Sequence, residues 1–312
     1  MARPIIIDCD PGQDDAVALL LAFAAPETLR VLGITTVAGN VPVARCARNA
    51  RAICELAGRT DLRVFAGCEY PLVRDPITAE HLHGPSGLGG VELPEPKMPL
   101  APSHAVDFLI ATLRNAPEPV TLIVTGPQTN LATALRRVPQ IASKIERIVA
   151  MGGSIRGGNI TPFAEFNIHV DPQAAEIVLG LGVPVTLFGL DVTHQVIATD
   201  ERIEAIRALD NPAARAVADM LGFYGRQKKA AGFPGAPLHD PCTIAWLLEP
   251  ALFEGSPMRV RIETREGPRT GQTSCASVPA EHANALVMHW ADVEGFFRLL
   301  TERLEFYSSA RG

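Results

Sequence analysis

The sequence has few cysteines, few aromatic residues and no long hydrophobic run. Its six cysteines are scattered over 312 residues without a C-x-x-C pair, so we expect reduced thiols, with neither a disulfide framework nor a zinc site. The longest uninterrupted apolar run, 16–25, is far too short to cross a membrane. The apolar run near the N-terminus is also too short for a signal peptide. These absences predict a cytoplasmic protein that does not bind membranes.

Basic residues do not cluster anywhere in the sequence. There are 28 Lys and Arg against 34 Asp and Glu, which gives a formal net charge of -6. Because nucleic acids are bound through dense positive charge, the sequence predicts no nucleic-acid polymer as a partner. No G-x-G-x-x-G follows an expected strand, so the glycines do not indicate a dinucleotide site.

The sequence does contain a regular alternation of apolar strands and helical patterns. Apolar residues make up 47% of it, enough for one large α/β domain or two smaller ones, and no linker interrupts the chain, so we expect a single domain over 1–312. The expected strands are 4–8, 30–39, 120–126, 147–153 and 183–191. The expected helices are 14–25, 42–57, 103–115, 129–137 and 171–181. This order predicts an α/β fold with an open, mainly parallel, doubly wound (Rossmann-like) mixed sheet and helices on both faces.

Two stretches break the alternation. Segment 71–102, rich in Pro, Gly and His, is too long for a plain connector, so we expect a functional loop. Segment 225–241 is a second irregular stretch. Further on, period-2 patterns at 258–267 and 282–290 predict a terminal hairpin, and 291–305 is expected to be an amphipathic helix.

Polar side chains recur where the expected strands end. Parallel strands place their carboxyl ends along one edge of the sheet, where ligands bind in doubly wound folds. The sequence therefore predicts a ligand site at this edge. The residues concerned are Asp8, Asp10, Asn40, Thr125, Asn159, Glu165 and Asn167.

Four aspartates are crowded into "IIIDCDPGQDDAVALLLAF", where the first strand gives way to the first helix. Asp14 and Asp15 could simply stabilise the helix N-terminus, by ~0.3–1 kcal/mol each. That explanation leaves Asp8 and Asp10 unaccounted for, because crowded carboxylates raise one another's pKa or require a cation. Hard oxygen ligands suit Ca²⁺ or Mg²⁺, so the motif favours a divalent metal site.

A further acid, Asp240, precedes another expected helix in "LHDP". It could be the helix N-cap, with Pro241 in the first helical position. It could equally be a site carboxylate, with His239 beside it. The residues alone leave both interpretations open.

Taken together, the motifs resemble those of the nucleoside hydrolases, the inosine-uridine preferring nucleoside N-ribohydrolase family. The stretch "DCDPGQDDAVALLLA" is similar to the family's N-terminal signature. It is followed, in family order and spacing, by "VAGN", "HGPSGLGG", "TGPQTNLATAL", "MGGSIRGGNITPFAEFNIHVDPQAA", "LDVTH" and "HDPCTIAWLLEP". The resemblance covers the chain from end to end. It implies hydrolysis of the N-glycosidic bond of ribonucleosides to ribose and free base, with a bound Ca²⁺.

The resemblance also implies a role for each candidate residue and an assembly. The implied calcium ligands are Asp10, Asp15, Asp240 and the carbonyl of Thr125. The implied catalytic residues are Asp10 as general base, Asn40 orienting the attacking water, and His239 on the nucleobase side. The implied substrate-binding residues are Asp14, His83, Met151, Asn159, Glu165, Asn167 and Asp240. Family members commonly form dimers or tetramers, so a homodimer or homotetramer is expected.

The chemistry of the reaction agrees with these roles. Cleavage passes through an oxocarbenium-like ribosyl cation, which carboxylates stabilise, and a histidine can assist the departing base. A single displacement by water predicts inversion at the anomeric carbon.

Purine-preferring family members tend to carry aromatic residues before "HD"; few tyrosines occur in 220–240 here, which favours pyrimidine nucleosides.

Two other functions remain open at this level. A metal-dependent phosphohydrolase is one, because a strand ending in D-x-D also occurs in aspartyl-phosphate enzymes, although the companion lysine and downstream acidic pair are not evident. The other is a catalytically silent nucleoside- or sugar-binding protein. Release of free ribose without added phosphate would separate hydrolysis from both.

Overall fold

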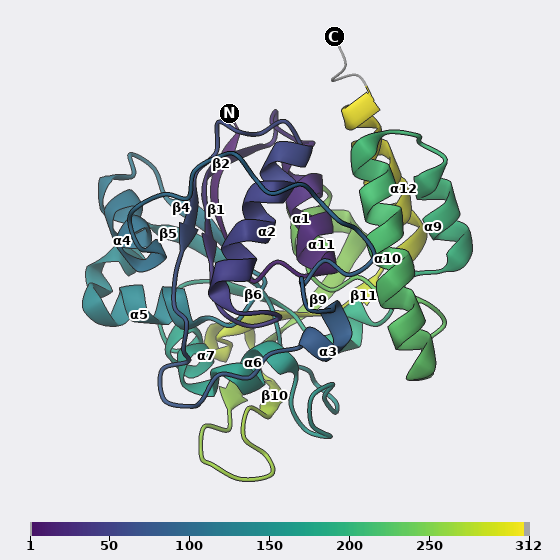
Figure 1. The fold of residues 1–312 in the computed structure, drawn as a ribbon. Coiled ribbons are helices and arrows are strands. Elements are labelled where there is room, and N and C mark those ends of the chain that lie inside the picture. The colour runs from purple at the N-terminus through teal and green to yellow at the C-terminus, as the bar shows by residue number, and fades with distance from the viewer. Residues whose placement is uncertain (1, 309–312) are drawn as a thin grey trace.

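A nine-stranded sheet forms the centre of the computed structural model, which describes residues 2–308 (Figure 1). Its strands are β1 (Arg3–Cys9), β2 (Leu29–Thr36), β3 (Val64–Ala66), β4 (Val120–Val124), β5 (Ile145–Met151), β6 (Val185–Phe188), β9 (Phe253–Ile262), β10 (Thr273–Ser277) and β11 (Ala285–Ala291). Their order across the sheet is β10-β9-β11-β6-β5-β4-β1-β2-β3. A second, small sheet pairs β7 (Ile197–Ala198) with β8 (Ala236–Pro237).

Twelve α-helices are described between and after these strands. They are α1 (Gln13–Phe23), α2 (Val43–Leu56), α3 (Glu80–His83), α4 (Ala105–Asn115), α5 (Thr129–Arg137), α6 (Phe166–Val170), α7 (Pro172–Leu179), α8 (Leu190–Thr193), α9 (Asp200–Arg207), α10 (Pro212–Ala230), α11 (Pro241–Leu248) and α12 (Val293–Glu305). None of the helices in the described part of the chain is both long enough and apolar enough to cross a membrane.

In the large sheet, parallel pairing joins β3, β2, β1, β4, β5, β6 and β11 in that order, whereas β9 pairs antiparallel with β11 and β10 pairs antiparallel with β9. The predicted open, mainly parallel mixed sheet is therefore confirmed. In register, Asp8 of β1 lies beside Thr35 of β2 and Val124 of β4. The carboxyl ends of these three strands are thus level, and the loops that follow them meet at one edge.

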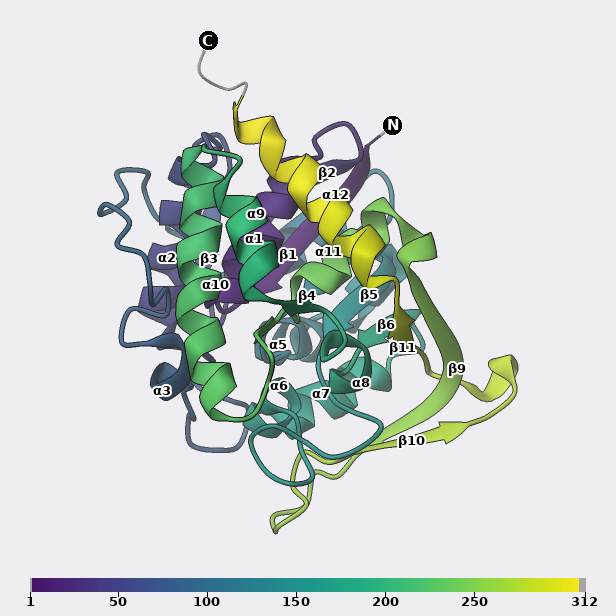
Figure 2. The ribbon, with the colours of Figure 1, turned by 90° about the vertical axis from the view of Figure 1, so that its right-hand side faces the viewer.

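Helices cover both faces of the sheet, with α4 and α5 on one side and α9, α10 and α12 on the other (Figures 1 and 2). Side chains of a strand alternate between the faces. Ile5 and Ile7 pack in the core under α1, α10, α11 and α12, whereas Ile6 packs in the core under α4, α5 and α7. Burial on both faces explains why the first strand is a continuous apolar run.

Some element boundaries differ from those predicted. Segment 225–241 was expected to be irregular, but α10 continues to Ala230, because Tyr224 and Lys228, one turn apart, are both buried against the body of the protein. The expected hairpin partners do pair, as β9 with β11, but β10 adds a further strand outside β9. Its residues are mostly exposed or half-buried, so no clear period-2 pattern marks it.

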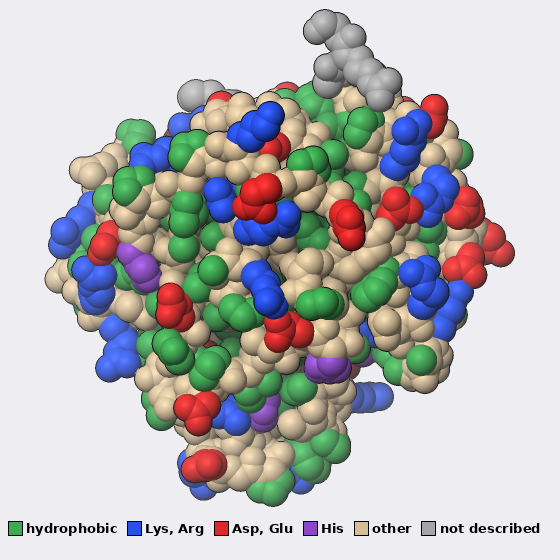
Figure 3. Space-filling view, viewed as in Figure 1, with side chains coloured by type: hydrophobic (Ala, Val, Ile, Leu, Met, Phe, Trp, Pro, Cys, Tyr) green, Lys and Arg blue, Asp and Glu red, His purple; other side chains and the backbone are tan. Residues whose placement is uncertain are grey.

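Segment 71–102 contains one regular element, α3, which lines the cavity at the carboxyl edge of the sheet, and it ends beside the start of β3, where the Ala101 N–H donates to the Val64 carbonyl. The Ala79 N–H donates to the Asn40 carbonyl, and the Asn49 side chain donates to the carbonyls of Pro11 and Ser86. These bonds fasten the segment to the loops that follow β1 and β2. On the face in Figure 3, basic and acidic side chains are interspersed.

Candidate active site

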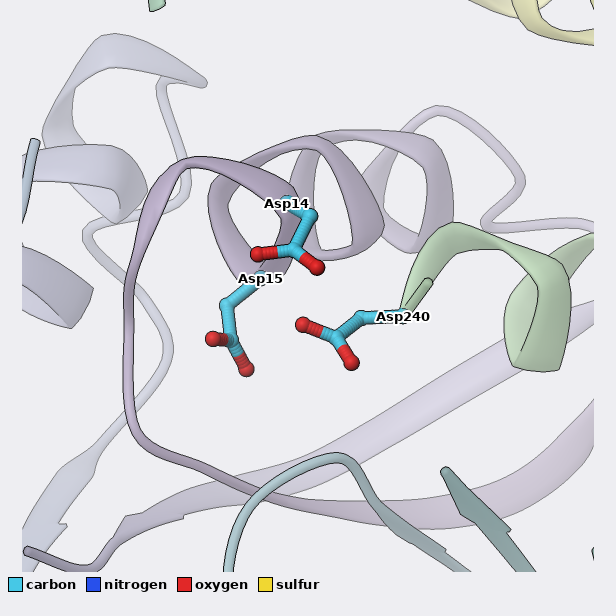
Figure 4. Close-up of side chains that lie close together, drawn as sticks. All are labelled: Asp14, Asp15 and Asp240. Atoms are coloured by element: carbon cyan, nitrogen blue, oxygen red, sulfur yellow. The ribbon is translucent and has the colours of Figure 1, made fainter. Parts of the chain in front are cut away.

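Three buried carboxylates point toward one another at the carboxyl edge of the sheet (Figure 4). Asp14 and Asp15 lie in the first turn of α1, Asp240 immediately precedes α11, and one ligand oxygen of each lies within 4.8 Å of the others. Asp240 occupies the N-cap position, but its side chain makes no capping hydrogen bond. Its carboxylate therefore belongs to the cluster and not to a helix cap.

Asp15 takes part in both the helix start and the cluster. Its Oδ2 accepts the Gly12 N–H at 3.1 Å, as in a capping box. Its Oδ1 accepts the Thr125 hydroxyl at 2.8 Å, from the end of β4. The turn that begins α1 therefore also fixes the carboxylate in the site.

Asp10 lies in the turn between β1 and α1 and is fully buried. Its Oδ2 accepts the Asn40 N–H at 2.7 Å, and the Asn40 side chain donates back to the Asp10 carbonyl at 3.1 Å. Two glycines make room for the carboxylate: a Cβ at Gly39 would lie 2.1 Å from Oδ2, and one at Gly126 would lie 2.5 Å from Oδ1. Asp10 Oδ1 itself has no hydrogen-bond partner among the described residues.

The electrostatics of the cluster fit a divalent cation. Burial, and next the charge of Asp15, raise the pKa of Asp10 well above its usual range and that of Asp14 to about 7. Burial, and next Asp14, also raise the pKa of Asp240. A bound cation would offset this repulsion, and the unpartnered Asp10 oxygen offers a ligand atom. With the Thr125 carbonyl nearby, the ligand set is entirely oxygen, as Ca²⁺ and Mg²⁺ prefer.

Asp8, the remaining aspartate of the motif, faces a different part of the protein. Its carboxylate accepts the Thr35 hydroxyl at 2.6 Å and the Asn130 side chain at 2.8 Å. Asn130 also donates to the Thr36 carbonyl at 2.9 Å. Asp8 therefore ties β1 to β2 and α5.

Glu165 and Asn167 form a second group of buried polar side chains in the site. Glu165 accepts three backbone N–H groups, among them those of Gly153 and Asn167, each at 2.9 Å. Burial raises the pKa of Glu165 to about 7. The Asn167 side chain donates to the carbonyls of Thr125 at 2.7 Å and Met151 at 3.2 Å. Both side chains are thus held rigidly after β5.

Two buried histidines, His83 and His239, lie at another part of the site. His239 Nδ1 is paired with the Thr193 hydroxyl at 2.8 Å, and its Nε2 has no partner among residues 2–308. His83 Nδ1 is paired with Gln13 at 2.5 Å, and its ring stacks on Tyr224 with centroids 5.5 Å apart. Burial lowers the pKa of His239 well below its usual range and that of His83 to about 3. Both rings are therefore neutral near pH 7.

Most of these residues line one cavity. Every residue given a catalytic, substrate-binding or metal-binding role lines it except Asp10 and Asp15, which are hydrogen-bonded to the lining residues Asn40 and Thr125. The predicted residues that line it are Asp14, Asn40, His83, Thr125, Met151, Asn159, Glu165, Asn167, His239 and Asp240. The arrangement suits a substrate with one hydroxyl-rich part and one uncharged ring.

Comparison with known proteins identifies this arrangement. Residues 5–298 match the family model described as inosine-uridine preferring nucleoside hydrolase. The chain belongs to this family. The pyrimidine-specific ribonucleoside hydrolase RihA of Photobacterium profundum is 49% identical to it, over 98% of this chain and 100% of the relative. The RihA of Escherichia coli O7:K1 is 48% identical, over 99% of this chain and 100% of the relative.

Solved structures agree with this assignment. The purine-preferring ribonucleoside hydrolase of Gardnerella vaginalis superposes with a TM-score of 0.91 at 32% identity, covering 99% of this chain and 100% of that one. The predicted activity, hydrolysis of ribonucleosides, is thereby confirmed, and neither phosphohydrolase nor silent binding protein is favoured.

Several residues of this nucleoside hydrolase site were not predicted from the sequence. They are Ala79, His81, Leu82, Ile160, Phe166, Tyr224 and Lys228. Lys228 follows Tyr224 by four residues, the spacing that puts two helical side chains on one face. That spacing was the available signal, but it required knowing that α10 extends this far.

Proposed function

We propose that this nucleoside hydrolase cleaves pyrimidine ribonucleosides, uridine and cytidine, in preference to purine ribonucleosides, with Ca²⁺ as cofactor. The observation that carries the proposal is one cavity with buried carboxylates on one part of its wall and two neutral histidines with a single tyrosine on another. Carboxylates stabilise the positive charge of a ribosyl cation. The part of the wall with the two histidines and one tyrosine fits a small nucleobase. The relatives named pyrimidine-specific match over their whole length, which supports the base preference.

Each residue has a proposed task. Asp10 accepts a proton from the attacking water, which Asn40 orients. The ribose hydroxyls are held by Asp14, Asn159, Glu165, Asn167 and Asp240, with Met151 packed against the sugar. Asp10, Asp15, Asp240 and the Thr125 carbonyl would hold the cation, which when bound lowers the pKa of a water molecule. His239, through its free Nε2, donates a hydrogen bond to the departing base, and His83 contacts the base.

A nucleoside panel tests this proposal. We expect kcat/KM for uridine and cytidine to exceed that for inosine and guanosine at least ~10-fold, about 1.4 kcal/mol of transition-state discrimination. Free ribose is measured in phosphate-free buffer. A preference for inosine would contradict the pyrimidine assignment, and a requirement for phosphate would indicate a phosphorylase.

His239→Ala should slow uridine hydrolysis by roughly 10²–10⁴-fold, because the departing base loses its hydrogen-bond donor. A 4-nitrophenyl riboside has a leaving group that is stable as an anion, so its hydrolysis should change little. His104→Ala is the control, since His104 caps α4 and does not line the cavity. Equal losses on both substrates would leave His239 with only a supporting role.

Glu165 should give the enzyme a pH-dependent activity. Its ionised form is the one that stabilises a ribosyl cation, and burial raises its pKa to about 7. That form is present above pH 7 and is lost as pH falls through 7, so kcat/KM should fall below this pH. In Glu165→Gln the part of this dependence that Glu165 causes should disappear, with a plateau roughly 10²-fold lower, while Asp14, whose pKa is also raised to about 7, still titrates. An unchanged pH profile in the variant would assign the titration to another group.

A homodimer or homotetramer, a cytoplasmic location and a single domain over 1–312 stay predictions. The single domain is supported by the one large sheet, which extends from β1 near the N-terminus to β11.

A further inference from the structure

Lys228 places a buried positive charge in the substrate cavity. The residue is only 7% exposed, and Nζ lies 5.0 Å from the ring centroid of Tyr224 and 5.8 Å from that of Phe233. Within residues 2–308, Nζ makes neither an ion pair nor a hydrogen bond. Burying an ammonium group without such partners is costly, so the position calls for a functional explanation.

Lys228 is the one Lys or Arg among the described residues that line the cavity. Its charge also lowers the pKa of His83, after the larger effect of burial. The lysine therefore helps to keep the His83 ring neutral. Burial lowers the pKa of Lys228 itself, while Asp14 opposes this effect and favours the ammonium. Lys228 therefore supplies a fixed positive charge on this part of the cavity wall.

The bond cleaved in uridine determines where such a charge is useful. Water oxygen bonds to C1′, a proton passes to Asp10, and the C1′–N1 bonding pair departs with the base. The resulting uracil anion spreads its charge over N1, O2 and O4, and later takes up a proton from solvent as Asp10 releases its own. A fixed ammonium on the cavity wall therefore suits a pyrimidine leaving group, whose negative charge reaches its exocyclic oxygens.

We propose that Lys228 is a catalytic residue whose ammonium contacts a carbonyl oxygen of the departing pyrimidine and stabilises its negative charge. The inference rests on the proposed function and deepens it by separating two tasks on the base side. His239 supplies a directional hydrogen bond, and Lys228 supplies charge.

Lys228→Met tests this role, because it removes the charge and keeps an unbranched side chain. We expect kcat for uridine to fall by roughly 10²-fold, as when one preorganised electrostatic group is lost, while KM changes by less than about threefold. The loss should be smaller for 5-fluorouridine, whose base is a better leaving group, and smallest for 4-nitrophenyl riboside. Lys228→Arg, which keeps the charge, should recover part of the uridine activity.

Lys229→Met is the matched control. Lys229 is the next residue of α10, but its side chain is 39% exposed and pairs with Asp200 at 2.6 Å on the surface. Lys229→Met should leave kcat and KM unchanged for uridine, 5-fluorouridine and 4-nitrophenyl riboside. If Lys228→Met does not fold, Lys228→Gln carries the same expectation.

Two results would overturn the role of Lys228: a uridine kcat within about threefold of wild type, or equal losses on uridine and the aryl riboside. The second result would mean that Lys228 only supports Asp14 or the fold. The wild-type nucleoside panel tests the pyrimidine preference separately. An inosine preference there would reject the proposed function, whatever the activity of Lys228→Met. A uridine preference in the wild type, together with an unchanged kcat in Lys228→Met, would reject only the catalytic role of Lys228.

Discussion

2′-Deoxyuridine is expected to be hydrolysed ~10⁴-fold or more slowly than uridine, because a site built to bond a hydroxyl rejects an analogue that lacks it. The groups proposed to bind ribose are buried: Glu165 is 2% exposed, Asn167 7% and Asp14 4%. Glu165 and Asn167 are also fixed by hydrogen bonds to the backbone. They cannot turn to water when a substrate hydroxyl is missing, so their lost bonds go unreplaced.

The comparison uses kcat/KM for the two nucleosides in the same phosphate-free buffer, because both carry the same base. A binding site that recognised mainly the nucleobase would treat them alike. Similar rates for uridine and 2′-deoxyuridine would therefore contradict the assignment of the carboxylate wall to the ribose hydroxyls.

Asp10→Asn is expected to lower kcat by roughly 10²–10⁴-fold on uridine and on 4-nitrophenyl riboside alike, because activation of water is common to both reactions. The amide can still accept the Asn40 N–H, but it neither accepts a proton nor brings negative charge to a cation. The shared loss distinguishes Asp10 from His239, whose removal should affect mainly the natural nucleoside.

Asp8→Asn is the control within the same motif. Asp8 is also buried, but it bonds to Thr35 and Asn130 away from the cavity, and an asparagine oxygen can accept those bonds. Its kcat should stay within roughly tenfold of wild type. If Asp8→Asn were as inactive as Asp10→Asn, the division of the motif into one structural and three site aspartates would be wrong.

Much of the fold was predictable because strands buried on both faces are continuous apolar runs, and each is followed by a helical pattern. The edge that holds the site was predictable for the same reason, since polar residues follow those runs. The division of labour between Asp8 and Asp10 was not. Residues two apart share a face within a strand, but β1 ends at Cys9, and the turn sends Asp10 elsewhere.

Other site features depend on contacts distant in sequence. Asp240 had two local interpretations, and only its position facing Asp14 and Asp15 decides between them. Lys228 is a charged residue in a polar stretch, "GRQKKA", which alone indicates a solvated helix face. It is buried, with the rings of Tyr224 and Phe233 near its ammonium group, and no local pattern encodes that packing.

The buried carboxylates are proposed to hold a divalent cation that serves ribonucleoside hydrolysis. Elemental analysis of purified, active protein in metal-free buffer tests it most directly. We expect about one calcium ion per chain in the wild type, and loss of both calcium and activity in Asp10→Asn and in Asp15→Asn. Wild-type protein that releases ribose from uridine at full rate while containing no divalent metal would contradict it.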